Sequence, residues 1–170
     1  MIGLFWITEE SVHLGAEPEG QGRGVRLTPE GLEAVGTVGT VGTDQRGSWA
    51  WADIRAVDIH HVQVRASTGW LMHSVADTVL DLAAGIGETP PPFELHVRTA
   101  TDETAELTVH CAVPGGYVQS EYELSLELLH RFVDGTADVA RLLEWGRAEG
   151  GGTTPWRPAR EALLRSWATT

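Results

Sequence analysis

Residues 49–59, WAWADIRAVDI, carry the strongest fold signal in the chain. Trp49 and Trp51 are two positions apart, so their side chains share one face of an extended strand. Full burial of each indole contributes about 2–3 kcal/mol of apolar transfer free energy. Apolar residues recur at positions 54, 57, 59, 62 and 64, which predicts a further strand from Ile54 to Val64. We therefore expect both indoles side by side in the interior of a curled antiparallel sheet that is plugged by the segment near Leu126.

The composition bounds the class of protein and its partners. A chain of 170 residues with 42% hydrophobic content suits one compact domain with an appendage. All 12 basic residues are arginine, and the formal net charge is −12. Such an acidic molecule repels phosphate backbones and anionic lipid surfaces. We therefore expect no nucleic-acid partner and no polybasic docking to membranes.

Three features of the sequence predict a cytoplasmic location. The single cysteine, Cys111, excludes an intramolecular disulfide and is expected to be an inert buried thiol. The first residues, MIGLFW, are hydrophobic but lack the basic segment of a signal peptide. No uncharged apolar run in the sequence reaches the length of a membrane-spanning helix.

Short strands and turns are expected before residue 49. Alternating apolar residues and turn residues predict strands at 2–7, 11–14, 25–27 and 32–35. Pro29 and Gly31 predict a type I turn between the last two of these strands. The repeat GTVGTVGT at 36–43 lacks the GKS or GKT of a phosphate-binding loop, so we interpret it as a connecting loop.

The period changes to that of a helix at residues 70–84. Apolar residues form a wide stripe there, and His73, Asp77 and Asp81 share another side because they are four positions apart. We interpret this trio as a solvated helix face, while metal binding or acid–base chemistry remains the alternative. Glycines and the run Pro90-Pro91-Pro92 then end the helix.

A last hairpin is predicted from the alternation of residues 93–98 and 107–111. Placing Val97 opposite Leu107 and Leu95 opposite Val109 brings both apolar faces to one side.

Histidines in these strands are candidate metal ligands. In the register just given, His96 and His110 lie on the exposed face, with Glu94 opposite His110. The adjacent His60 and His61 point to opposite faces of a strand, so they cannot share one metal comfortably. We interpret all four as solvated side chains and expect no metal site.

Two helices are expected after the strands. Ser120 and Glu123 have the spacing of a capping box. A second helix is expected from Thr136 or Asp138, ended by Gly146. The apolar stripe of the first helix comprises Tyr122, Leu126, Leu129 and Val133.

The sequence divides into a domain at 1–148 and a tail at 149–170. The glycines at 150–152 have linker composition, and Pro158 suits the first turn of an amphipathic helix. Its basic side chains are Arg157, Arg160 and Arg165, and its apolar ones are Leu163, Leu164 and Trp167. On an acidic body this tail either docks back onto the domain as a helix, or is disordered or bound in a partner groove, and the sequence leaves these alternatives open.

The order of elements resembles the pleckstrin-homology-like superfold and its bacterial families. Those families have a Leu-Thr-x-x-Gly-Leu turn followed by a Trp-x-x-Ile-x-x-Val strand, matched here by LTPEGL at 27–32 and WADIRAV at 51–57. The resemblance covers roughly residues 2–133. It implies an α+β fold: a split antiparallel β-barrel or sandwich of about seven strands, with an inserted helix (70–84) and C-terminal capping helices. It also implies a binding scaffold with no catalytic residue. The arginine or lysine cluster of phosphoinositide-binding members is missing between the first two strands.

Metalloprotease, hydrolase and dinucleotide-binding motifs are absent from the sequence, so we expect no catalytic residue, cofactor or metal. The predicted function is a non-enzymatic cytoplasmic module acting through protein–protein interaction, as a scaffold or regulator, with itself as one candidate partner. Two alternatives remain open. One is a small-ligand or metal-binding protein or enzyme using a barrel cavity, and the other is a peripheral membrane protein. The candidate interaction surface comprises Trp70, Leu71, Val75, Val79, Trp156, Arg157, Arg160, Leu164, Arg165 and Trp167.

Overall fold

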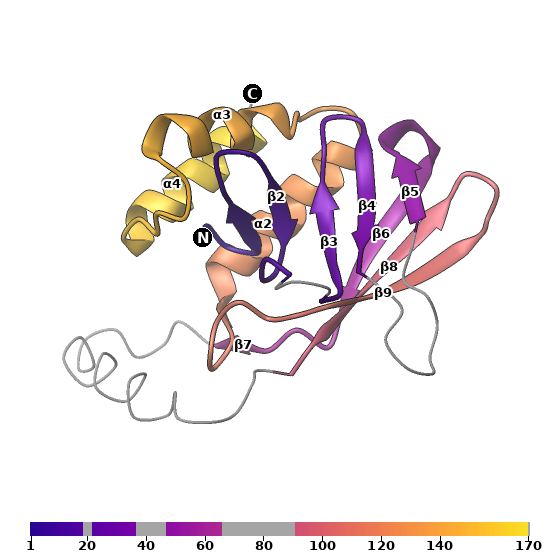
Figure 1. Ribbon diagram of the computed structural model, residues 1–170, viewed down its shortest axis with the longest axis horizontal. Coiled ribbons are helices and arrows are strands. Elements are labelled where there is room, and N and C mark those ends of the chain that lie inside the picture. The colour runs from indigo at the N-terminus through magenta and orange to yellow at the C-terminus, as the bar shows by residue number, and fades with distance from the viewer. Residues whose placement is uncertain (19–21, 37–46, 66–90, 170) are drawn as a thin grey trace.

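The computed structural model describes residues 1–18, 22–36, 47–65 and 91–169. They form an α+β molecule in which helices cover antiparallel sheets, as predicted (Figure 1). Within these residues the strands form separate sheets rather than one closed barrel. Several predictions lie outside the described residues: the helix at 70–84 with Trp70, Leu71, Val75 and Val79, the trio His73, Asp77 and Asp81, and most of the loop at 36–43.

The first sheet is a five-stranded antiparallel meander. Its strands are β1 (Phe5–Ile7), β2 (Val12–Leu14), β3 (Gly24–Leu27), β4 (Gly31–Val35) and β5 (Gly47–Ala50). A turn joins β3 to β4 at the predicted place, where the Thr28 N–H donates to the Gly31 carbonyl at 2.8 Å. A Cβ on Gly31 would lie 1.9 Å from the Trp49 carbonyl oxygen, so the close approach of β5 requires glycine here.

The second sheet contains β6 (Ile54–His60), β8 (Phe93–Thr99) and β9 (Thr104–Val109), all antiparallel. A separate parallel pair joins β7 (Val64–Arg65), which follows β6 in the chain, to β10 (Tyr117–Val118), which follows β9. The predicted β8–β9 register is wrong by two residues, because Leu95 pairs with Leu107 and Val97 with Ala105. The cause is the turn, in which the Thr99 N–H donates to the Glu103 carbonyl at 2.9 Å. An even shift keeps every side chain on its predicted face.

The two tryptophans do not lie in one strand. β5 ends at Ala50, and Trp51 begins a 3₁₀ turn, η1 (Trp51–Asp53), that leads from the first sheet into β6. Both indoles are only half-buried against the core, so the prediction of an interior pair is wrong. The Trp51 Nε1–H donates to the Thr28 carbonyl at 2.9 Å, which satisfies the polar edge of the ring at this corner.

Three helices follow within the described residues: α2 (Gln119–Val133), α3 (Ala140–Glu149) and α4 (Arg157–Ala168). None is both long and apolar enough to cross a bilayer. The predicted capping box is wrong, since α2 has no side-chain cap and Ser120 bonds elsewhere. The predicted end at Gly146 is also wrong: this glycine lies inside α3, where a Cβ would be 2.1 Å from the Thr8 carbonyl oxygen.

The predicted apolar stripe of α2 is only partly correct. Leu129 is fully buried as expected, but Leu126 instead lines a shallow groove on the outer side of the helix. The buried face comprises Glu121, Ser125, Leu128, Leu129 and Phe132. Two polar residues share this face because each has a partner from another element, and a count of apolar positions cannot detect such partners.

Candidate functional site

The tail residues of the candidate surface lie in α4, except Trp156, which directly precedes it. Leu164 is fully buried, and Trp167 is 5% exposed. The Trp167 ring meets Trp145 of α3 edge-to-face, with ring centroids 6.1 Å apart. The structure thus has the tail helix docked on its own body. Leu164 and Trp167 are unavailable to a partner in this arrangement.

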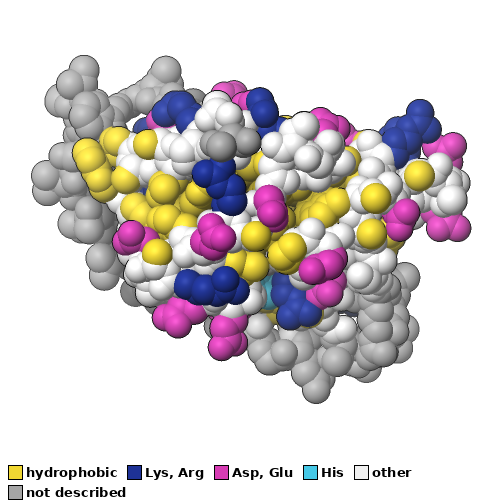
Figure 2. All heavy atoms as spheres, turned by 90° about the horizontal axis from the view of Figure 1, so that it is seen from above, with side chains coloured by type: hydrophobic (Ala, Val, Ile, Leu, Met, Phe, Trp, Pro, Cys, Tyr) yellow, Lys and Arg dark blue, Asp and Glu magenta, His cyan; other side chains and the backbone are white. Residues whose placement is uncertain are grey.

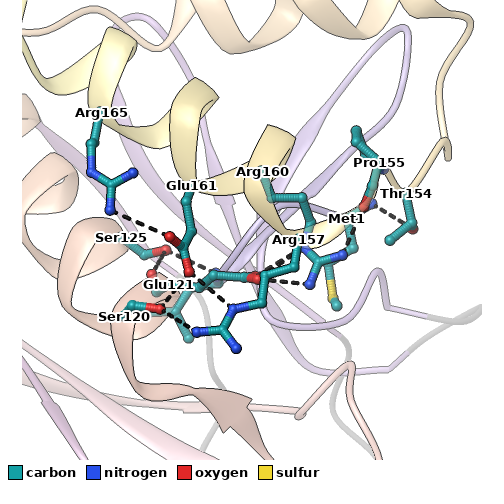
Figure 3. Close-up of polar contacts among 11 residues, drawn as sticks. Met1, Ser120, Glu121, Ser125, Thr154, Pro155, Arg157, Arg160, Glu161 and Arg165 are labelled. Atoms are coloured by element: carbon teal, nitrogen blue, oxygen red, sulfur yellow. Dashed lines mark hydrogen bonds and ion pairs between the residues drawn. The ribbon is translucent and has the colours of Figure 1, made fainter. Parts of the chain in front are cut away.

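Arg160 and Glu121 join α4 to α2 by an ion pair with little exposure to water (Figure 3). The Arg160 Nε donates to both carboxylate oxygens at 3.0 and 3.1 Å, and Nη2 donates to one of them at 2.6 Å. Nη1 donates to the Pro155 carbonyl at 2.7 Å. The two side chains are 18% and 5% exposed, so each charge depends on the other for compensation.

A second cluster of polar side chains surrounds Glu161, which lies on α4 (Figure 3). The Ser120 hydroxyl donates to its carboxylate at 2.7 Å, and the Arg157 Nε donates at 3.0 Å. Arg165 adds a longer contact of 3.3 Å. The hydrogen bond from Ser120 is the main cause of a lowered pKa of Glu161, with the two arginines adding to it against the opposing effect of burial. Arg157 and Arg165 therefore serve intramolecular contacts as well.

The chain entering β1 fits tightly against the buried face of α2. The Leu4 N–H donates to the Ser125 hydroxyl at 3.1 Å, and that hydroxyl donates to the Glu121 carbonyl at 2.6 Å. Gly3 has φ +55°, and a Cβ there would lie 2.1 Å from the Ser125 oxygen. The position of Glu121, and hence of α4, is thus fixed from two sides.

Trp156 is a residue of the candidate interaction surface whose side chain faces solvent. Its side chain is 74% exposed, and no other large hydrophobic side chain in the described part of the chain is comparably exposed. Its backbone is fixed, because its carbonyl accepts from the N–H groups of Ala159 and Arg160 at 3.0 and 3.1 Å. The segment before it is also held, since the Gly152 N–H donates to the Ile7 carbonyl at 3.1 Å. The structure therefore presents this indole to solvent from a fixed backbone.

A hollow of about 660 Å³ lies over the outer face of β1, β2 and β3. Its wall includes Trp6, His13 and Arg26, which are neighbours across the strands, together with Glu17 and the backbone of Gly151–Gly152. The Trp6 Nε1–H donates to Glu17 at 3.1 Å, and Arg26 is paired with Glu33 on β4. Two further carboxylates, from the exposed turn between β1 and β2, make the rim acidic.

His13 is the most deeply placed side chain of this wall. It is 7% exposed, and its Nε2 lies 3.0 Å from the Ser11 hydroxyl, while its buried Nδ1 has no hydrogen-bond partner among the described residues. Burial lowers the pKa of His13 below its ordinary value of 6.5, and Arg26 acts in the same direction against the opposing charge of Glu17. The imidazole is therefore neutral near pH 7.

This burial predicts a loss of stability in mild acid. Above pH 6.5 His13 is neutral in both the folded and unfolded states. As pH falls from 6.5 to the lower folded-state pKa, the unfolded chain takes up a proton that the folded chain does not, so the free energy of unfolding decreases. Between pH 7 and pH 5 the wild type should lose more of its melting temperature than His13→Gln does. His110→Gln, at an exposed position, is the matched control. Parallel curves for all three proteins would contradict this role of His13.

The Ser11–His13 distance invites comparison with a catalytic pair. Activation of a serine needs a base within about 3 Å and a third group that orients the base. Here the hydroxyl of Ser11 is also bonded to Thr8 at 2.9 Å, and Nδ1 of His13 has no orienting partner. Among the residues that the structure describes, the pair therefore lacks the orienting group that activates a serine.

Histidines also gather on the second sheet, in a way the sequence did not predict. His61 follows the end of β6 in a left-handed conformation, φ 62°, so strand alternation does not apply to it. The Glu94 carboxylate lies 3.5 Å from its Nδ1 and 3.3 Å from Nε2 of His96. The centroids of the His60 and His96 rings are 4.4 Å apart. In the strand register, Glu94 lies opposite His60 of β6 and Thr108 of β9, so the predicted position opposite His110 is wrong. Within the described ranges, no three side chains are arranged to hold a metal ion.

Comparison of the chain with protein-family models, with curated proteins and with solved structures finds no significant match. The assignment of a function therefore rests on the chain's own residues. Two surfaces stand out among those described: the exposed Trp156 and the acidic hollow beside Trp6.

Proposed function

We propose that the protein is a non-enzymatic binding module that acts through protein–protein contact, with Trp156 as the anchor of the interface. The observation that carries this proposal is the 74% exposure of one indole directly before a docked helix. Tryptophan is among the residues that most often dominate binding energy at interfaces, because it buries a large apolar area at a small entropy cost. A face with such a side chain is therefore the first place to expect a partner.

The contacts behind Trp156 support the proposal. The backbone of α4 is tied to α2 through Arg160 and Glu121, so the indole requires no reordering of the helix before it binds. A residue presented from a fixed backbone loses less entropy on association than one on a free tail. The upper face of the molecule shows hydrophobic side chains between scattered charges of both signs (Figure 2). Interfaces between separately folded proteins are about as apolar as the rest of the surface, so this composition is compatible with one.

The charge of the chain favours a partner with a basic surface. At a net charge of −12, long-range attraction speeds association with positively charged proteins and opposes association with nucleic acid or anionic lipid. A cytoplasmic scaffold or regulatory module fits these properties. We also propose a pleckstrin-homology-like arrangement, because two antiparallel sheets are followed by a helix, α2, that packs on β6. The parallel β7–β10 pair and the helices α3 and α4 depart from that arrangement.

Capture from a lysate of the native host tests this function. The full chain is used as bait beside Trp156→Ala and Trp156→Phe, and the melting temperatures of all three should be similar because the side chain is exposed. We expect a protein retained by the wild type, reduced with phenylalanine and lost with alanine. Retention of the same proteins by the wild type and the alanine variant would refute Trp156 as the anchor. If the only protein captured is the host's own copy of this chain, the face would be assigned to self-association.

A further inference from the structure

The hollow beside Trp6 has features of a ligand site. Its floor holds the side chain of His13, which is 7% exposed and incompletely bonded, since Nδ1 has no partner in the part of the chain that the structure describes. A buried polar atom without a partner costs about 1–3 kcal/mol, and most such atoms in proteins are satisfied. A hydrogen-bond donor that enters between Trp6 and Arg26, the two cross-strand neighbours of His13, would satisfy it. Of these two neighbours, Arg26 is exposed and Trp6 is half-buried.

The charges around the hollow select a cationic ligand. Glu9, Glu10 and Glu17 are exposed at its rim, while the charge of Arg26 is already matched by two hydrogen bonds to Glu33. Glu17 lines the hollow and accepts a hydrogen bond from the Trp6 indole. An indole face beside a carboxylate is a favourable place for a cation, which gains both ring attraction and ion pairing. In the tautomer whose Nε2–H donates to the Ser11 hydroxyl, a neutral His13 adds Nδ1 as an acceptor without repelling the cation.

Among cations, the guanidinium group fits this set best. It is planar, so it stacks on an indole, and its several N–H groups reach a carboxylate and an imidazole acceptor at the same time. We propose that the hollow over β1, β2 and β3 binds the guanidinium group of an arginine side chain carried by the protein partner. The inference rests on the proposed function for the source of that arginine. The backbone of Gly151–Gly152 at the rim offers further contacts to the partner's main chain.

The test is a titration of the full chain with three probes, followed through calorimetry and the Trp6 indole signal in nuclear magnetic resonance spectra. The probes are the capped peptide Gly-Gly-Arg-Gly-Gly, the same peptide with neutral citrulline in place of arginine, and methylguanidinium. We expect the arginine peptide to bind about tenfold more tightly than methylguanidinium, because its backbone adds hydrogen bonds. The citrulline peptide should bind weakly or not at all, and the signal of Trp6 should shift only with the cationic probes.

Two variants of equal net charge make the result specific. Glu17→Gln should weaken binding of the arginine peptide about fivefold, whereas Glu103→Gln, on the exposed β8–β9 turn, should leave it unchanged. Equal weakening by both variants would reduce the effect to general attraction and overturn the inference, as would no binding of the arginine peptide. If methylguanidinium bound as tightly as the arginine peptide, the hollow would be assigned to a small guanidinium ligand, and the inference of a protein-borne arginine would be overturned. If these titrations fail while capture still depends on Trp156, the inference falls and the proposed function stands.

Discussion

Arg160→Ala is expected to lower the free energy of unfolding by about 3–5 kcal/mol. The substitution leaves the Glu121 carboxylate, whose side chain is 5% exposed, without its opposing charge and without three hydrogen bonds. It also frees the Pro155 carbonyl at the start of α4. The loss comes mainly from the uncompensated carboxylate, because an intact buried pair contributes little net stability over an apolar replacement. Equilibrium unfolding in urea measures it.

Two further variants separate this cause from a general effect of removing an arginine. Arg165→Ala removes a side chain that is 58% exposed and makes one longer contact to Glu161, so its change should stay within about 0.5 kcal/mol. The double replacement Glu121→Met with Arg160→Met removes both charges and should recover most of the lost stability. Similar small losses for Arg160→Ala and Arg165→Ala would show that α4 does not depend on the buried pair.

Phe132→Ala should cost about 3–5 kcal/mol, as expected for a buried phenylalanine. Its ring is 1% exposed and lies between Phe5 of the first sheet and Trp51 of the η1 corner, with centroids 6.3 and 5.7 Å away. Leu126→Ala is the matched control on the same helix. Because Leu126 lines the outer groove, its loss should be about 1 kcal/mol or less. If Leu126→Ala lowered the free energy of unfolding more than Phe132→Ala, the inward face of α2 would be the stripe through Leu126 that the sequence predicts, and the observed packing would be contradicted.

The parts of the fold that the sequence predicts are those set by neighbouring residues. The turn before Gly31, the inward faces of β8 and β9 and the helical tail all follow from local alternation, turn chemistry or helical period. Trp51 escapes prediction because it belongs to a corner between two sheets. Its hydrogen-bond partner, the Thr28 carbonyl, lies 23 positions earlier. The tertiary partner, rather than the local pattern, decides where such a residue goes.

The candidate site shows the same limit. Trp156 is among the nominated surface residues, and so are Leu164 and Trp167, yet these two are buried. Both belong to a helix that is tied to α2 by Arg160 and Glu121, two residues 39 positions apart. The sequence alone does not indicate the hollow, because Trp6, His13 and Arg26 belong to three separate strands and lie on the face turned away from the core. Correct register across β1, β2 and β3 would have placed them side by side, and that register is the signal that could have identified them.

The affinity of the captured partner for the full chain and for Trp156→Ala tests the central claim most directly. Calorimetric titration of the purified pair should show at least about 30-fold weaker binding for the variant, equivalent to about 2 kcal/mol, as for an interface anchor. The melting temperature should be unchanged, because the indole is 74% exposed. Equal affinity of the two proteins for the partner would contradict the account.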